Sequence, residues 1–176
     1  MLFSDEGGII IYPIFHVALP LIITEIPKIK RLRINKISLI IGALLPDIID
    51  KPLLFLGLGM GRSFSHSLLF LFVSFLIVHF VTKRNKSISL ALFTGITAHM
   101  ILDLPDVPFF YPFISYEFPI VEEPILYWFI KLFTDPFTLI TEITGILFIG
   151  YIVINNKLYQ RNDLSNYLKG THQSLN

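Results

Sequence analysis

Several side chains that could bind a metal ion or move a proton interrupt the apolar stretches of this sequence. The clearest pair lies in AHMILDLPD, residues 98–106, where His99 and Asp103 are four residues apart. On a helix this spacing puts both side chains on one face, and the three-residue spacing of Asp47 and Asp50 does the same. Imidazole and carboxylate groups on facing helices are the donors with which helical bundles hold metal ions in their cores.

The donor types restrict the metal. The chain contains no cysteine, and imidazole with carboxylate suits Zn²⁺, Mn²⁺ or Fe²⁺, of which we expect Zn²⁺. Three histidines and four carboxylates would be enough for two or three ions, and two ions about 3.5–4 Å apart activate water and clamp a phosphoryl oxygen. The candidate ligands are His16, Asp47, Asp50, His66, His99, Asp103 and Glu142.

Three residues are candidates for the chemistry itself. We expect Asp50 or Glu142 to bind metal or to act as the general base, and Arg62 to orient an anionic group or stabilise its transition state. Simpler interpretations remain open. His99 with Asp103 could be only a buried hydrogen-bonded pair, and Glu142 could pair with Arg62.

The elements that carry these residues are expected to be membrane-spanning helices. The chain of 176 residues is 53% hydrophobic and only 15% charged, with mean hydropathy +0.69, whereas soluble domains carry about 25% charged residues. Five stretches approach the roughly 20 apolar residues that a spanning helix needs, and none alternates like a barrel strand. They are residues 9–26, 37–58, 64–82, 88–104 and 137–154. The sequence therefore predicts an all-α membrane bundle of about five helices.

Two regions do not fit a plain span. Pro46 and Pro52 interrupt the second stretch, which we expect to end near Asp50, with a loop over residues 51–63. The proline-rich connection 105–136 excludes one continuous helix, although a short interfacial helix is expected near residues 122–133.

The basic residues predict the orientation in the cell membrane. Eleven of the 14 Lys and Arg residues lie between the first two stretches, between the third and fourth, or after the fifth. The positive-inside rule puts these segments in the cytoplasm, so the N-terminus is outside and the C-terminus inside. The candidate ligands then share one depth near the outer face. Residues 1–154 are expected to form one domain and residues 155–176 a polar cytoplasmic tail. A net charge of +1 gives no reason to expect a nucleic-acid partner.

Three motifs carry a resemblance to a known family. They are GALLPDIIDKP (42–52), GRSFSHSLLF (61–70) and GITAHMILDLPD (95–106), the last followed by FFYPF (109–113). Together they resemble the YdjM-like membrane-bound predicted metal-dependent hydrolases, whose pattern is related to the all-α, zinc-dependent phospholipase C and P1 nuclease superfamily. The resemblance implies metal-ligand positions at His16, Asp47, Asp50, His66, His99 and Asp103, with Glu142 as the acidic residue of the last helix.

The motifs also depart from the family pattern. The commonest second motif reads Pro-Asp-x-Asp-His, whereas here the second carboxylate, Asp50, comes one place later and Lys51 follows it. The third motif often opens His-Arg-Gly and here opens with Gly61, Arg62 and Ser63. Two nitrogen ligands are therefore missing, so a single or a structural metal ion is also consistent with the sequence.

These observations favour a membrane-bound, metal-dependent hydrolase of a phosphoester. The expected depth of the site favours a lipid-borne anionic substrate, with membrane lipid as the surrounding partner. One alternative is a cation transporter, but the fourth stretch offers only Ser89 and Thr94 on the way to the cytoplasm. The other is a non-catalytic membrane protein in which a metal ion or ion pairs hold the helices together.

Overall fold

The computed structural model describes residues 11–59, 61–117 and 123–171, and the regular secondary structure of these residues is entirely helical. The elements are α1 (Pro13–Ile23), α2 (Pro27–Lys30), α3 (Lys36–Phe55), the 3-10 turn η1 (Phe64–His66), α4 (Leu68–Val81), α5 (Lys86–Leu102), α6 (Pro124–Thr134), α7 (Pro136–Asn155) and α8 (Arg161–Leu168). The all-α prediction is confirmed. Residues 9–10 of the first predicted stretch and residue 122 of the predicted interfacial helix lie outside the described residues.

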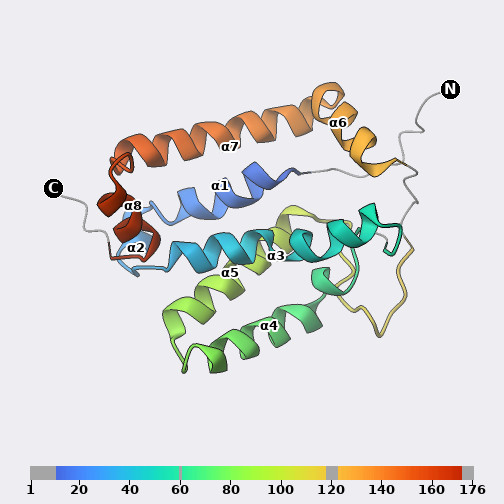
Figure 1. The fold of residues 1–176 in the computed structure, drawn as a ribbon, viewed down its shortest axis with the longest axis horizontal. Coiled ribbons are helices and arrows are strands. Elements are labelled where there is room, and N and C mark those ends of the chain that lie inside the picture. Colours follow the sequence, from blue (N-terminus) through green and yellow to red (C-terminus); the bar gives the residue numbers. More distant parts are fainter. Residues whose placement is uncertain (1–10, 60, 118–122, 172–176) are drawn as a thin grey trace.

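The helices form a layered bundle. Figure 1 shows α7 lying along α1, α3 and α5 packed together in the middle, and α4 on the far side of α5. The short helices α2 and α8 lie together at one end of the bundle, whereas α6 lies at the other end, beside the start of α7. Short polar side chains begin four of the helices by accepting backbone N–H groups, as N-caps do. These caps are Asn35, Ser67, Asn85 and Asp135.

Two glycines allow α3 and α5 to cross at close range. A Cβ atom on Gly42 would lie 2.3 Å from the Leu92 carbonyl oxygen, and one on Gly95 would lie 2.3 Å from the Leu39 carbonyl oxygen. Neither contact is sterically possible, so only glycine lets the two backbones approach this closely. The close approach sets the second half of α3 against the last turns of α5, where the candidate ligands are.

Helix α3 is longer than expected. It continues through Pro46 and Pro52 to Phe55 instead of ending near Asp50, so the predicted loop over residues 51–63 was wrong in its first five residues. A proline inside a helix removes one hydrogen bond and kinks the helix without having to end it. The end of α3 contacts α6, because the ring centre of Phe55 lies 5.4 Å from that of Trp128 and the Lys51 ammonium lies 3.9 Å from the same ring.

The number of membrane spans is only partly supported by helix length. Among the residues that the structure describes, one helix, α7, is both long and apolar enough to cross a membrane. Helices α1, α4, α5 and α6 are apolar but have 11, 14, 17 and 11 residues. The five-span arrangement and the direction of the termini therefore stay predictions, as does the interfacial position of α6.

Apolar side chains cover much of the outside of the bundle. Only Phe70 and Leu71 are buried on α4, while Phe80 and Val81 at its end are 62% and 76% exposed. Half of the residues of α7 are exposed as well, including Leu147 at 65%. Exposed apolar surface on this scale marks a surface that contacts something other than water, and lipid is the simplest such environment.

Candidate metal centre

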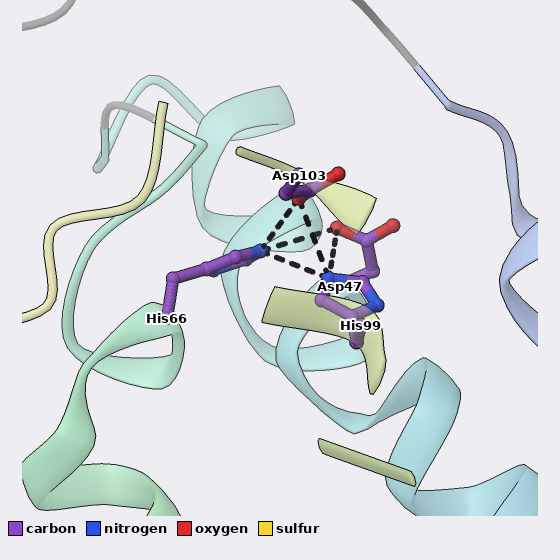
Figure 2. Close-up of side chains that lie close together, drawn as sticks. All are labelled: Asp47, His66, His99 and Asp103. Atoms are coloured by element: carbon purple, nitrogen blue, oxygen red, sulfur yellow. Dashed lines mark hydrogen bonds and ion pairs between the residues drawn. The ribbon is translucent and has the colours of Figure 1, made fainter. Parts of the chain in front are cut away.

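Four ionisable side chains converge between α3, η1 and α5. Asp47 lies on α3, His66 ends η1, His99 lies on the last turn of α5, and Asp103 caps the C-terminus of that helix. One ligand atom from each residue lies within 4.8 Å of the others, and all four residues are buried. Figure 2 shows the side chains pointing toward a common centre. We call these residues the histidine–aspartate cluster.

Local hydrogen bonds explain why η1 delivers His66 to this point. The Ser65 hydroxyl donates to the Pro46 carbonyl at 2.8 Å, which fastens the turn to α3. The Ser67 hydroxyl accepts the Phe70 N–H at 3.1 Å and so starts α4 directly after the turn. His66 is thereby fixed between two helices with its side chain 0% exposed.

The two imidazoles face each other through the same kind of nitrogen atom. His66 Nδ1 lies 2.8 Å from Asp50 Oδ2, and His99 Nδ1 lies 2.7 Å from the Ala43 carbonyl oxygen. Both partners are acceptors, so we assign the proton of each neutral ring to Nδ1, which donates. Both Nε2 atoms then carry lone pairs, yet they lie 3.1 Å apart. A cation between them would satisfy both, and a backbone or carboxylate partner on the other nitrogen is the usual support of a metal-binding histidine.

The carboxylates complete the same picture. Asp103 Oδ2 lies 3.4 Å from His66 Nε2 and 3.5 Å from His99 Nε2, and Asp47 Oδ1 lies 3.7 and 3.8 Å from the same atoms. Asp47 Oδ1 is buried and accepts no hydrogen bond from any described residue. A buried acceptor without a donor is costly. Two imidazole nitrogens and two carboxylate oxygens that converge in one buried site therefore fit a divalent cation such as Zn²⁺.

Two cations flank the cluster, one beside each carboxylate. Arg62 Nε lies 3.5 Å from Asp103 Oδ2, and Arg62 Nη1 lies 3.2 Å from Asp106 Oδ2. Lys51 Nζ lies 3.4 Å from Asp47 Oδ1 on the other side. Arg62 is thus at the cluster as expected, although it contacts Asp103 and Asp106 and has no ion pair with Glu142 among the contacts of the described residues.

The other three predicted ligands surround the cluster without joining the four. Asp50 lies behind His66 and accepts hydrogen bonds from Ser63 N and Ser63 Oγ, both at 2.8 Å, as well as from His66. His16 Nε2 lies 3.2 Å from Asp103 Oδ1, on the side of that carboxylate turned away from His66. Glu142 Oε1 accepts the Phe15 N–H at 3.0 Å, next to His16 on α1.

Sequence reasoning missed the residues that hold the ligands in place. Ser63 and Ser65 bind Asp50 and α3, and Asp106 shares Arg62 with Asp103. Only Lys51 had a readable signal, because it lies four residues after Asp47 and a helix puts the two side chains side by side.

Fold and site together define an all-helical membrane protein with a buried group of residues suited to a metal ion. The chain matches the YdjM inner membrane protein family over residues 13–162 and belongs to that family. This confirms the family resemblance and the membrane location that the composition predicts. No curated protein and no solved structure matches the chain significantly, so the relation to the phospholipase C and P1 nuclease superfamily stays a prediction.

Proposed function

We propose that this protein is a membrane-embedded, metal-dependent hydrolase of a phosphoester. The observation that supports the proposal most directly is the pair of imidazole Nε2 atoms, 3.1 Å apart, with carboxylate oxygens of Asp47 and Asp103 beside them. Asp47, His66, His99 and Asp103 would hold the ion. A divalent ion lowers the pKa of a bound water molecule to about 7 and polarises a phosphoryl oxygen.

The surrounding residues have separate tasks in this proposal. Asp50 uses both carboxylate oxygens on Ser63 and His66, so it keeps the His66 ring in place. Glu142 accepts the Phe15 N–H and lies beside the Ile14 N–H, and its remaining lone pairs could accept a proton beside His16. Arg62 supplies a fixed positive charge at the Asp103 side, where it would orient an anionic phosphoryl group.

The metal content of the purified protein tests the first step. The full chain is extracted in mild detergent without chelator, and metals are counted per chain for wild type and for His99→Ala/Asp103→Ala. We expect at least one equivalent of zinc or manganese in wild type and none in the double variant. The matched control is His79→Ala, because His79 lies on α4 and contacts Ser89, away from the cluster.

Turnover of a soluble phosphodiester, bis(p-nitrophenyl) phosphate, tests the second step. The proposal predicts metal-dependent hydrolysis by wild type and by His79→Ala, and loss of hydrolysis in the double variant. The absence of bound metal in wild type, even after incubation with excess zinc and manganese, would remove this mechanism.

A non-catalytic role for the same metal has one observation in its favour. Arg62 and Lys51 already pair with the two carboxylates, and both histidine side chains are 0% exposed, as in a closed structural site. Loading the protein with Mn²⁺ separates the two functions. An open site shortens the relaxation time of bulk water protons, whereas a closed structural site leaves it almost unchanged.

A further inference from the structure

One face of α3 carries an acidic, a basic and an aromatic side chain, in that order. Asp47, Lys51 and Phe55 are each four residues apart, so they lie in one row along the helix. The row begins with a carboxylate of the histidine–aspartate cluster, continues with a cation and ends with an aromatic ring. With a rise of about 1.5 Å per residue, it extends about 12 Å from the cluster.

Lys51 is held in a position that suits an anion. Its ammonium lies 3.4 Å from Asp47 Oδ1 and 3.9 Å from the centre of the Trp128 ring, and its side chain is 18% exposed. Only Lys51, Arg62 and Lys131 lie outside the three basic segments of the sequence. Two of these three cations are therefore at the cluster, where neither contributes to the orientation of the chain in the membrane.

The row leads into an apolar groove. Phe55 packs edge-on against Trp128, with ring centres 5.4 Å apart. The groove beyond it has a volume of about 460 Å³, within the range of about 300–1,000 Å³ usual for sites of small ligands. Its walls are formed by Phe55 from α3 and by Glu123, Pro124, Ile125, Leu126 and Phe129 at the start of α6. Ile125 and Phe129 are 67% and 64% exposed.

We propose that Lys51 and this groove form the binding site for a phosphate-bearing lipid, with the phosphate at Lys51 and one alkyl chain between α3 and α6. The inference rests on the proposed function, because it names the substrate class of the same site. A phospholipid matches the row formed by Lys51 and Phe55, because its anionic head is followed by an apolar chain. The head would lie beside the cluster, and the chain would contact Phe55, Leu126 and Phe129.

The charges favour this occupant over a neutral lipid or a free phosphate. A neutral lipid would fill the groove but leave Lys51 paired only with Asp47. Inorganic phosphate would reach Lys51 but leave the apolar walls uncovered. Only an amphiphile with an anionic head matches both parts, so selectivity for phosphate and for chain length must appear together and must depend on Lys51.

Trp128 is the only tryptophan of the chain, which makes its fluorescence a direct probe of this site. The full protein is placed in phosphatidylcholine nanodiscs with a 16-carbon alkylphosphonate brominated near its chain end. Bromine quenches tryptophan on contact, and the C–P bond resists hydrolysis. We expect saturable quenching, half complete at about a tenfold lower mole fraction than for the equally brominated alcohol, because a charge-assisted contact holds the head.

Lys51→Gln tests the role of the cation, and Lys131→Gln is its matched control. Lys131 also lies over a ring of α6, 5.6 Å from the centre of Tyr127. The inference predicts that the phosphonate and the alcohol quench the Trp128 fluorescence of Lys51→Gln equally. In Lys131→Gln the phosphonate should still quench at a lower mole fraction than the alcohol. A phosphonate with four carbons should compete poorly with the brominated probe in wild type. Equal quenching by both probes in wild type, or a preference that survives Lys51→Gln, overturns the inference.

Failure of this inference is distinguishable from failure of the proposed function. Metal content and hydrolysis of bis(p-nitrophenyl) phosphate are measured on the same samples. A protein that binds metal and hydrolyses this soluble ester, but shows no phosphonate preference, would retain the hydrolase activity and lose the lipid site. A preference for phosphonate in a protein that holds no metal would retain the lipid site and remove the hydrolase mechanism.

Discussion

Two polar clusters, one buried and one partly buried, differ in how their donors and acceptors are matched. The first is the histidine–aspartate cluster. The second, which we call the Glu25 cluster, consists of Glu25, Lys30, Asn156 and Tyr167. Glu25 Oε2 accepts from Lys30 Nζ at 2.7 Å and from Asn156 Nδ2 at 3.0 Å, and Glu25 Oε1 accepts from the Tyr167 hydroxyl at 2.9 Å.

The difference lies in how donors and acceptors are matched. In the Glu25 cluster every contact joins a donor to an acceptor, and a positive charge faces a negative one. In the histidine–aspartate cluster two imidazole Nε2 atoms face each other, and Asp47 Oδ1 has an ion pair with Lys51 but no hydrogen-bond donor among the described residues. The donors and acceptors of the Glu25 cluster satisfy one another, whereas the histidine–aspartate cluster has a place that could hold a cation. Buried polar residues alone therefore do not indicate a binding site, but mismatched ones do.

Removing Glu25 should have the largest effect on stability. Glu25→Ala leaves Lys30, Asn156 and Tyr167 without their common acceptor, and we expect a loss of about 3 kcal/mol in the free energy of unfolding. The loss should be the same with and without added metal, as measured by denaturant titration in detergent. Glu25→Gln, which keeps one acceptor oxygen, is the control and should lose less. An effect of Glu25→Ala on metal affinity would contradict the separation of the two clusters.

Added metal should stabilise the protein only through the histidine–aspartate cluster. A ligand at 100 times its Kd stabilises the folded state by about 2.7 kcal/mol. We expect a rise of this size for wild type when Zn²⁺ is added to the chelated protein, seen as a higher unfolding midpoint. His66→Ala should show almost no rise, while Tyr167→Phe should show the full rise. A zinc effect of equal size in His66→Ala would mean that the metal binds elsewhere.

The Glu25 cluster should weaken in alkali. Burial, followed by the negative charge and hydrogen bonding of Glu25, raises the pKa of Tyr167 above its usual value of 10.0. Because the folded-state pKa is the higher one, the contribution of this tyrosine to stability is complete below pH 10 and is lost as the pH rises through the folded value. Tyr167→Phe should lose about 2 kcal/mol at neutral pH.

The alkaline titration separates this role from a simple packing role. The stability curves of wild type and Tyr167→Phe should converge above pH 10, because the variant has no hydroxyl to ionise at this position. Parallel curves would show that the Tyr167 hydroxyl stabilises the fold only by packing. Tyr159, which is 71% exposed, provides the matched control in Tyr159→Phe.

The two clusters also differ in how far the sequence predicts them. Asp47, His66, His99 and Asp103 were found because ionisable groups are rare in apolar stretches. The Glu25 cluster was missed, since Glu25 stands at the very end of the first apolar stretch, and its partners lie in polar segments as far as 142 residues away. Residues 155–176 were expected to be a polar tail, yet α8 forms there and buries Tyr167 to 2% exposure. Contacts between distant polar segments leave no periodic pattern in a sequence.

The spacing of residues in the sequence also did not distinguish the candidate ligands from the residues that position them. The i,i+3 spacing of Asp47 and Asp50 predicts that both face the same way, but Asp50 is occupied by Ser63 and His66. That assignment depends on where the turn η1 packs, which is a tertiary contact. The end of α3 at Phe55 likewise makes a tertiary contact, with Trp128 of α6.

Asp50 gives the finest test of the comparison, because its own contacts are matched while it supports a mismatched centre. Asp50→Asn keeps an oxygen that can accept the His66 Nδ1 proton but removes the negative charge that makes the ring a stronger ligand. We expect metal affinity to fall about tenfold, at the low end of the effect of such supporting residues, with little change in the stability of the metal-free protein. Competition with a chromophoric chelator measures the affinity. Asp106→Asn, which alters only the Arg62 pair at the edge of the cluster, should leave the affinity close to wild type. If Asp50→Asn instead loses metal as completely as His66→Ala, Asp50 is itself a metal ligand. The metal site would then include more residues than the four that converge in this structure.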